Sequence, residues 1–359
     1  SKFSIEQKLI KFTTQKLKKI IIRNMISTPL KKSKLADYRL SIAPMMDCTD
    51  KHFRVLMRQI TKKSLLYTEM IVAQALHHSK NRGKLLDFDE IEHPISIQLG
   101  GDNPSLLAEA AEMAEDWGYD EINLNIGCPS PRVKSGNFGA CLMGKPKIVT
   151  KCIEKMKKAC KLPITIKQRL GIDNLDNDDY LLQFVDDCSL AGADRFIIHA
   201  RKAWLHGLNP RENRTIPPLQ YERVQKLKNN RPELTIELNG GLHTLNQCIN
   251  ALEVFDGAMV GRAAYSHPFE WRNIDSIIYG QKEKCISRSE IIKKIIPHAQ
   301  KHLENEGRLW QFSKHILNLI EKIPNAKKFR QELSEKSQTQ KANISILKKI
   351  AQQLEDAGH

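Results

Sequence analysis

From Leu40 onward, short runs rich in β-branched and apolar residues alternate with longer segments whose apolar positions recur at helical spacing, such as 104–118 and 146–160. Eight such β-then-α units predict a (β/α)₈ barrel, an α/β fold whose active site lies at the carboxyl ends of the strands. A doubly wound parallel sheet is the alternative, but no GxGxxG motif follows the first run. The eight runs are 40–45, 65–70, 95–100, 122–127, 164–169, 195–200, 234–239 and 257–262.

Two segments of different character flank the predicted barrel, which we place at residues 38–282. Residues 1–37 form a basic extension with loose helical spacing. Three explanations stay open: an organelle targeting segment, an additional nucleic-acid contact, or a start of the chain that is placed too early. Residues 283–359 read as wholly helical segments separated by short turns, which predicts a small helical-bundle domain. Its scattered lysines and arginines form either a solvated face or a surface that binds RNA.

Composition narrows the class of protein. No apolar run approaches the roughly 20 residues that cross a bilayer, so we expect no membrane association. Eight cysteines without CxxC spacing indicate reduced thiols in the cytoplasm and no metal site. A net charge of +16 makes nucleic acid the expected partner, although residues 1–36 alone hold ten Lys or Arg against one acid, Glu6.

Polar or charged residues stand at the end of nearly every β-rich run. Lys167 and His199 lie within otherwise apolar runs, where burying an unpaired charge would be costly. A lone histidine there is more often a hydrogen-bonded core residue, but a lysine and a histidine on consecutive strands favour a ligand pocket. The residues at the run ends are Pro44, Met45 and Met46; Glu69 and Met70; Gln98; Asn125 and Cys128; Lys167 and Arg169; His199 and Arg201; Asn239, Gly240 and Gly241; and Gly261 and Arg262.

The ends of the seventh and eighth runs indicate a phosphate subsite. The sequence 239–241 and the pair Gly261 and Arg262 offer backbone amides and a guanidinium where barrels commonly bind phosphate. Ordinary turn glycines are the alternative, but they would not explain why the ends of both runs carry groups that suit phosphate. Phosphate here, with Gln98 and Lys167 across the mouth, fits a flavin mononucleotide (FMN) whose ring edge bonds Gln98 and whose negative charge is stabilised by Lys167.

The stretch 122–144 joins an alternating strand to a loop of glycines and prolines that carries Cys128. A lone cysteine is as often a small buried hydrophobe as a reactive group. Cys141, in the same loop, is the competing thiol, and its apolar neighbours indicate packing.

With these residues identified, the chain resembles the tRNA-dihydrouridine synthases, flavoproteins that reduce a uracil ring in tRNA. The stretch HARKAWLHGLNPRENR resembles the A subfamily, which acts on D-loop uridines 20 and 20a. Residues before Leu40 lie outside the resemblance. The matching motifs are APMMD (43–47), LLYTEM (65–70), QLGG (98–101), NLNIGCPSPRVKSGNFGACLMG (123–144), TIKQRLGID (165–173), IIHARKAWLHGLNPRENRTIPPL (197–219), LNGG (238–241) and DGAMVGRAAY (256–265).

The resemblance implies a role for each matching residue. Hydride from the flavin adds to carbon 6 of the uracil, and Cys128 donates a proton to carbon 5. A thiol can donate near pH 7 because its typical pKa of about 8.5 keeps it protonated there. NADPH reduces the flavin beforehand. Asn125 would contact the uridine, and Arg211, Glu212, Arg214, Gln311 and Lys314 would contact tRNA, although the family often has arginine where Lys314 stands. The implied flavin contacts are Pro44, Met45, Met46, Gln98, Lys167, His199, Asn239, Gly240, Gly241, Gly261 and Arg262.

Two other functions are compatible with parts of this pattern. A flavin barrel acting on a free pyrimidine, as in dihydroorotate oxidation, would need neither the basic helical segment nor the arginines of PRENR. A non-catalytic RNA-binding protein would not need Cys128, Lys167 and His199 together. We therefore expect a monomeric oxidoreductase with FMN as cofactor and with tRNA and NADPH as its substrates.

Overall fold

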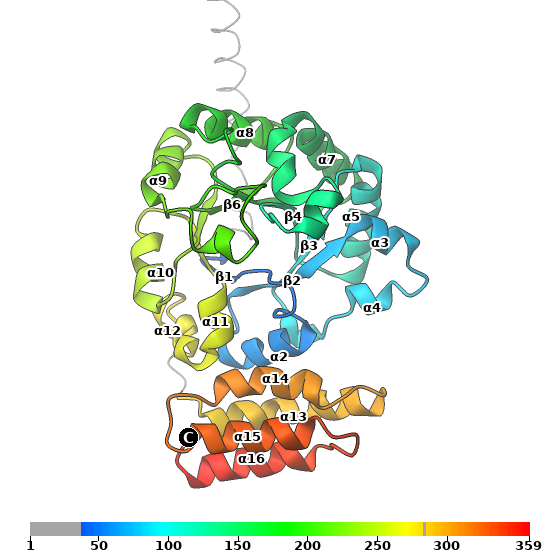
Figure 1. Ribbon diagram of the computed structural model, residues 1–359, viewed down its shortest axis with the longest axis vertical. Helices are drawn as coiled ribbons and strands as arrows, with labels where there is room; N and C mark the ends of the chain where they lie inside the picture. The colour runs from blue at the N-terminus through cyan, green and yellow to red at the C-terminus, as the bar shows by residue number, and fades with distance from the viewer. Residues whose placement is uncertain (1–36, 283–284) are drawn as a thin grey trace, which may run out of the picture. The chain divides into compact units, whose positions relative to one another are not determined.

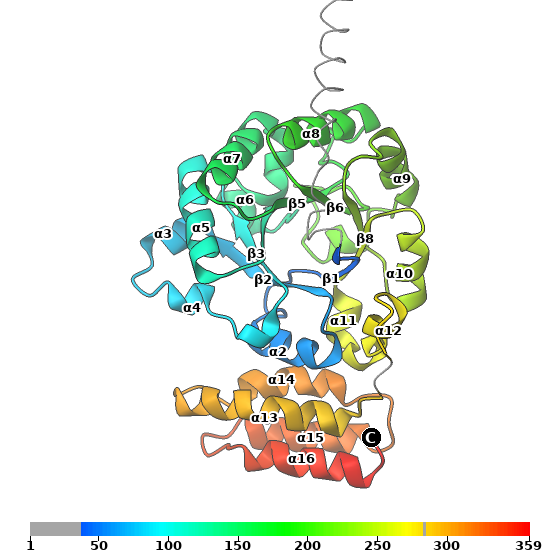
Figure 2. The ribbon, with the colours of Figure 1, turned by 180° about the vertical axis from the view of Figure 1, so that it is seen from behind.

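Eight parallel strands form a closed barrel in the computed structural model of the protein, which describes residues 37–282 and 285–359. Each strand pairs with its neighbours in sequence order, and β1 closes the barrel against β8 (Figures 1 and 2). This confirms the (β/α)₈ prediction. The strands are β1 (Leu40–Ile42), β2 (Leu65–Val72), β3 (Ile95–Gly100), β4 (Glu121–Ile126), β5 (Ile164–Arg169), β6 (Arg195–His199), β7 (Ile236–Asn239) and β8 (Gly257–Val260).

Helices surround the barrel in both views (Figures 1 and 2). Helix α5 (Pro104–Trp117) begins and ends at residues that suit those positions. Asn103 accepts hydrogen bonds from Ser105 N and Leu106 N at the start of α5, and Gly118 ends that helix in a left-handed conformation. The helices are α2 (Lys51–Ile60), α3 (Ala73–His78), α4 (Gly83–Leu86), α5 (Pro104–Trp117), α6 (Pro131–Ser135), α7 (Pro146–Ala159), α8 (Asp178–Leu190), α9 (Tyr221–Asn230), α10 (Leu245–Leu252), α11 (Arg262–Ser266) and α12 (Ile274–Ile277), with short 3₁₀ turns η2 (Glu90–Glu92), η3 (Gly139–Gly144), η4 (Glu212–Arg214) and η5 (Pro268–Trp271).

Four helices occupy most of residues 285–359; two of them, α13 (Arg288–Glu304) and α14 (Trp310–Leu319), lie beside α2, the first helix of the barrel, and the other two pack against α13 and α14 (Figures 1 and 2). A hydrogen bond from His315 Nε2 to Asp50 Oδ1 (2.8 Å) and an ion pair between Lys314 and Asp50 (2.8 Å) join them to the barrel. These four helices fit the predicted helical segment, while its exact boundary at residue 283 stays a prediction. The other two are α15 (Ala326–Ser337) and α16 (Ser345–Asp356).

The basic extension predicted at residues 1–37 lies outside the described residues except for Asp37. None of the helices in the described ranges combines the length and apolar content needed to cross a bilayer. No disulfide joins any two of the eight cysteines, all of which are described.

The interior of the barrel is largely polar, as β4 illustrates. Ile122, Leu124 and Ile126 belong to the large apolar cluster that the strands share with the surrounding helices. The alternate residues of β4 are fully or almost fully buried polar side chains that hydrogen-bond to neighbouring strands across the interior. The alternation that identified the strand therefore gives it an outer apolar face and an inner polar one. The polar residues of β4 are Glu121, Asn123 and Asn125.

Candidate active site

The carboxyl ends of the strands open into a cavity of about 1570 Å³, with walls from the barrel and from α13 and α14. Most residues predicted for the site line this cavity, whereas Arg211, Glu212 and Lys314 are not among its lining residues. The fold thus gathers residues from all eight strand ends, as a barrel active site requires. The predicted residues in the lining are Pro44, Met45, Met46, Gln98, Asn125, Cys128, Lys167, His199, Arg214, Asn239, Gly240, Gly241, Gly261, Arg262 and Gln311.

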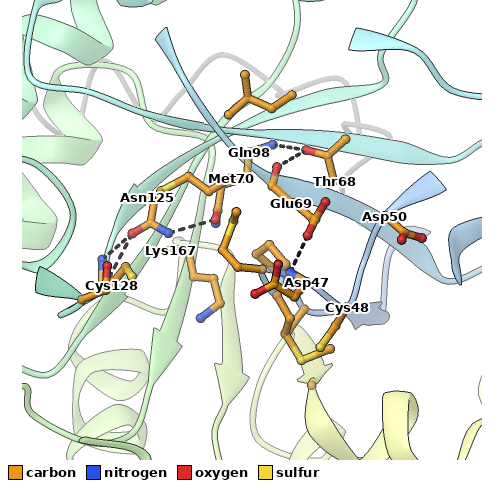
Figure 3. Close-up of a pocket in the computed structure, with 18 of the residues that line it drawn as sticks. Asp47, Cys48, Asp50, Thr68, Glu69, Met70, Gln98, Asn125, Cys128 and Lys167 are labelled. Atoms are coloured by element: carbon orange, nitrogen blue, oxygen red, sulfur yellow. Dashed lines mark hydrogen bonds between the residues drawn. The ribbon is translucent and has the colours of Figure 1, made fainter. Parts of the chain in front are cut away.

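Asn125 links the end of β4 to the loop that carries the thiol (Figure 3). Its Oδ1 accepts hydrogen bonds from the backbone N–H groups of Gly127 (3.2 Å) and Cys128 (3.0 Å). Its Nδ2 donates to Gln98 Oε1 at 2.9 Å. The carbonyl of Cys128 accepts from Ala140 N (2.9 Å), so the loop is fixed on both sides of the thiol.

The side chain of Lys167 projects into the cavity from β5, and its Nζ makes no hydrogen bond or ion pair with any described residue (Figure 3). Burial lowers its pKa to about 8, and the nearby Arg169 contributes to the same shift. A cationic side chain without a partner in a concave site favours an anionic ligand.

Arg169 holds three loops together at the same end of the barrel. Its Nε donates to Gly127 O (3.0 Å), and its Nη1 donates to Lys202 O (3.2 Å) and Asn213 O (2.9 Å). Sequence reasoning placed Arg169 at a strand end but gave it no role. Its position two residues after Lys167 was the available signal, because alternate residues of a strand share one face.

The corner formed by the ends of β6, β7 and β8 combines a turn of two glycines with the positive charge of Arg262. Gly240 and Gly241 adopt φ values of 103° and 72°, and Tyr221 fixes this turn by donating to Gly240 O (2.6 Å). A Cβ on Gly241 would lie 2.6 Å from the Tyr221 hydroxyl, so this position requires glycine. Such a turn with Arg262 beside it can bind a phosphate group.

His199 lies at this corner with its Nδ1 buried and without a hydrogen-bond partner. Burial and the neighbouring Arg169 and Lys167 cations hold the pKa of His199 well below its ordinary value. The imidazole is therefore neutral, and an unpaired buried nitrogen of this kind suits contact with a bound ligand.

The loop after β6 presents the predicted tRNA contacts at its end. Arg214 lines the cavity and is half-buried, whereas Arg211 is exposed and Glu212 accepts from Asn209 N (2.8 Å) within the loop. Asn213, to which no role was given, is fully buried. Its side-chain amide accepts from Trp204 N and donates to Trp204 O, at 2.8 and 2.9 Å, and so fixes the loop that presents both arginines.

The C-terminal helices contribute polar groups to the edge of the cavity. Gln311 lines it and accepts from His302 Nε2 (2.6 Å) and Arg308 N (3.0 Å). Lys314 instead forms the ion pair with Asp50. The pKa of Asp50 is well below its ordinary value, although burial opposes the shift, because His315, Lys314 and the Phe53 amide stabilise its anion.

A second thiol, Cys48, also lines the cavity, whereas Cys141 does not. Burial and the neighbouring Asp47 and Glu69 raise the pKa of Cys48. The thiol that rivals Cys128 by position is thus Cys48, and its place in the loop after the first β-run was the signal for it. Among the described residues, no three His, Cys, Asp or Glu side chains gather as a metal site requires.

Comparisons with known proteins agree with this architecture. The dihydrouridine synthase family model matches residues 41–355. The "tRNA-dihydrouridine(20/20a) synthase" of Synechocystis is 50% identical over 313 residues, covering 87% of this chain and 93% of that protein. Proteins of the same name from Shewanella oneidensis and Escherichia coli O6:H1 are each 44% identical, covering 90% and 86% of this chain and 96% and 93% of their own lengths.

The barrel also resembles a more distant solved structure, a complex of 2-naphthoyl-CoA reductase with 2-naphthoyl-CoA. The TM-score is 0.51 at 12% identity, and the match covers 68% of this chain and 50% of the other. That likeness supports the fold alone. The family model and the curated relatives confirm the resemblance seen in the sequence: the chain is an oxidoreductase that belongs to the dihydrouridine synthase family.

Proposed function

We propose that this protein reduces the C5–C6 double bond of D-loop uridines 20 and 20a in tRNA, with FMN as its bound cofactor and NADPH as its reductant. The observation that carries the proposal is the placement of Cys128, Lys167 and the Gly240–Gly241 turn around the same cavity. The names of the curated relatives support tRNA as the substrate. Cytoplasmic location and a monomeric state stay predictions.

The lining of the cavity fits FMN. The amides at Gly240 and Gly241 and the Arg262 guanidinium suit its phosphate. Lys167, which has no partner among the described residues, suits the electron-rich part of its ring, and Gln98 can bond the ring edge. His199, with its buried unpaired Nδ1, offers a further polar contact. The remaining proposed contacts are Pro44, Met45, Met46, Asn239 and Gly261.

When bound in the reduced state, the flavin supplies the hydride that adds to carbon 6 of the uracil. Cys128 Sγ holds the proton that must reach carbon 5, where negative charge develops. Asn125 fixes the backbone of Cys128 and lines the cavity, so it can also contact the base. Because the ring is stacked in the tRNA elbow, the nucleotide must leave its stack to enter the cavity.

The remaining proposed residues would bind the RNA around the extruded base. Arg214 lines the cavity from the loop after β6 and Gln311 lines it from α14, whereas Glu212 and exposed Arg211 are not among its lining residues. Lys314 can serve this purpose only by sharing or leaving its ion pair with Asp50. We accordingly propose residues 283–359 as a tRNA-binding domain.

Two measurements test the proposal. The purified protein should carry FMN, with absorption near that of free flavin, or bind added FMN stoichiometrically. Mapping dihydrouridine in tRNA from cells that lack the protein should show that positions 20 and 20a lose the modification. Loss of neither position would contradict the substrate, and turnover of free dihydroorotate or uracil by the protein would favour a free pyrimidine instead.

A further inference from the structure

A buried carboxylate lies below the proposed active site, inside the barrel. Glu121 Oε1 accepts hydrogen bonds from three hydroxyl groups, those of Tyr67 (2.9 Å), Ser96 (2.9 Å) and Thr165 (2.8 Å). Its Oε2 accepts from Arg195 Nη2 at 2.7 Å, and both ends of this ion pair are at most 1% exposed. No role in the reaction has been given to this cluster.

Hydrogen bonds connect the cluster to the cavity. Asn123 Nδ2 donates to Thr165 Oγ1 (2.9 Å), Gln98 Nε2 donates to Asn123 Oδ1 (2.8 Å), and Asn125 Nδ2 donates to Gln98 Oε1 (2.9 Å). Gln98, Asn123 and Thr165 are register partners on three neighbouring strands, while Asn125 lies two residues further along β4. We call the series Glu121, Thr165, Asn123, Gln98 and Asn125 the amide ladder.

The direction of the amide ladder is set at its buried end. A carboxylate only accepts, so the single hydroxyl hydrogen of Thr165 is committed to Glu121. The other acceptor near this hydrogen, Ile122 O at 3.4 Å, would also draw it away from Asn123. In either case Thr165 can only accept from Asn123, and Asn123 must therefore turn its nitrogen to Thr165.

The orientation then passes from one amide to the next. With its nitrogen on Thr165, Asn123 presents its oxygen to Gln98, so Gln98 turns its nitrogen inward and its oxygen to Asn125. Asn125 in turn presents its oxygen to the backbone N–H groups of Gly127 and Cys128. Both lone pairs of that oxygen are then occupied, and the one remaining N–H of Asn125 can only donate to a ligand.

We propose that Thr165 and Asn123 are positioning residues, which fix the amide orientations of Gln98 and Asn125 and the backbone at Cys128 from inside the barrel. That these groups contact flavin and uridine rests on the proposed function. The amide ladder itself rests on hydrogen bonds between buried side chains: Thr165 and Asn123 are both 0% exposed, and neither lines the cavity. If any one of these amides were flipped, its N–H would face another donor or its oxygen another acceptor, and such unpaired buried groups cost free energy.

Hydrogen exchange of the Gly127 and Cys128 amides in the purified full-length protein tests the proposal. Thr165→Val removes the hydroxyl at nearly constant volume, and Asn123 loses its fixed partner. We expect exchange of these two amides to become at least about tenfold faster at constant pH, since the Asn125 oxygen is no longer held on them. Thr165→Ser keeps the hydroxyl and should restore exchange to within about twofold of the parent protein.

Ser96→Ala is the matched control, because it removes a hydroxyl donor to the same Glu121 oxygen but lies outside the amide ladder. Its exchange at Gly127 and Cys128 should stay near that of the parent protein. Unchanged exchange in folded Thr165→Val, or an equal increase in Ser96→Ala, would overturn the proposal. Thr165→Ala, which removes the same hydroxyl without a new methyl group, takes the place of Thr165→Val if the latter does not fold.

A parallel titration with FMN separates this proposal from the proposed function. Thr165→Val should bind FMN about three- to tenfold more weakly than the parent protein, whereas Ser96→Ala should bind it equally well. Amide exchange requires neither flavin nor RNA. If the parent protein itself bound no FMN, the proposed function would fail, and the exchange result would still decide the amide ladder.

Discussion

The reaction proposed for this chain depends on one thiol, and two thiols line the cavity. Cys128 follows the strand that also carries Asn125, whereas Cys48 lies beside Asp47 and Glu69, whose charges raise its pKa. We predict that Cys128→Ala lowers the rate of uridine reduction by at least about 100-fold, since general-acid catalysis contributes on that order. Reduction of tRNA from a dihydrouridine-free strain, followed by nucleoside analysis, measures this rate.

Cys48→Ala provides the control for this prediction, because it removes a thiol from the same cavity. It should keep most of the activity, and both variants should bind FMN as the parent protein does. A large loss of activity in Cys48→Ala with near-normal activity in Cys128→Ala would show that Cys48, not Cys128, donates the proton.

The buried charge of Lys167 makes the stability of the folded protein depend on pH. Its folded pKa of about 8 lies below the ordinary value, so between pH 8 and about 10.5 the unfolded chain binds more protons and stability rises with pH. Lys167→Met removes the buried charge and should raise the melting temperature at pH 7 by roughly 2–5 °C. The gain should shrink as pH rises from 8 to 10.5, because Lys167 then becomes neutral.

Calorimetric melting curves at pH 7 and pH 10 measure this difference. Lys63→Met is a suitable comparison, because Lys63 is exposed. An equal gain from Lys167→Met at both pH values would show that the burial of charge is not its cause.

Sequence reasoning found the side chains whose type alone indicates chemistry and missed those whose role depends on partners. Lys167 was predictable because a lysine inside an apolar run is costly without a ligand. The side-chain partners of Asn213, Trp204 foremost, lie within its own loop. Arg169 instead bonds to backbone carbonyls of loops that are distant in the sequence. No spacing in the chain could reveal those partners, since only the closed barrel brings the loops together.

At the level of elements, the alternation of β4 predicted a strand but not which of its faces would be apolar core and which would line the barrel. In a sheet covered by helices, Ile122 and Leu124 pack outward. The polar residues that break the apolar pattern therefore point inward and form most of the amide ladder. The predicted carboxyl ends of β3, β5 and β7 match the structure, whereas those of β1, β2 and β8 differ from it by two or three residues. After β4 ends, Gly127 and Cys128 of the following loop line the cavity.

The Asp50 carboxylate both caps α2 and forms ion pairs with α14. Asp50 accepts from His52 N and Phe53 N at the start of α2 and also pairs with Lys314 and His315 of α14. Asn can still cap a helix but cannot pair with a lysine cation. We predict that Asp50→Asn lowers the free energy of unfolding by about 1–3 kcal/mol at pH 7, measured by urea denaturation.

The sign of the pH dependence follows from the lowered pKa of Asp50. Its contribution is fully present above the unfolded pKa of about 3.9 and is lost as pH falls toward the lower folded value. The difference between the parent protein and Asp50→Asn should thus be equal at pH 7 and pH 5 and smaller at pH 3. Asp87→Asn, which breaks an exposed ion pair with Lys51, should cost less than about 1 kcal/mol. An equal cost in both variants would mean that Asp50 does not fasten the helices to the barrel.

At the scale of the whole molecule, the distribution of positive charge determines which segments can bind RNA phosphates. Residues 1–37 contain ten basic and two acidic residues, so they carry half of the net charge of +16. The family match begins at residue 41, after this segment. The remaining half of the net charge belongs to the barrel and the C-terminal helices, which carry the proposed tRNA contacts.

Salt dependence can separate these two contributions. Each phosphate neutralised by Lys or Arg steepens the fall of the logarithm of tRNA affinity with the logarithm of salt concentration by about 0.7–0.9. Replacing the ten basic residues of 1–37 by Gln should lower this slope by about 2–4 and weaken binding mainly at low salt, as measured by filter binding between 50 and 300 mM KCl. Arg211→Ala, a single change in the family-matched region, should lower the slope by about 1. Because neither change touches Cys128, the rate at saturating tRNA should stay near that of the parent protein. Identical slopes for the parent protein and the Gln variant would show that the basic extension makes no contact with RNA phosphates, and that the family-matched region alone binds the substrate.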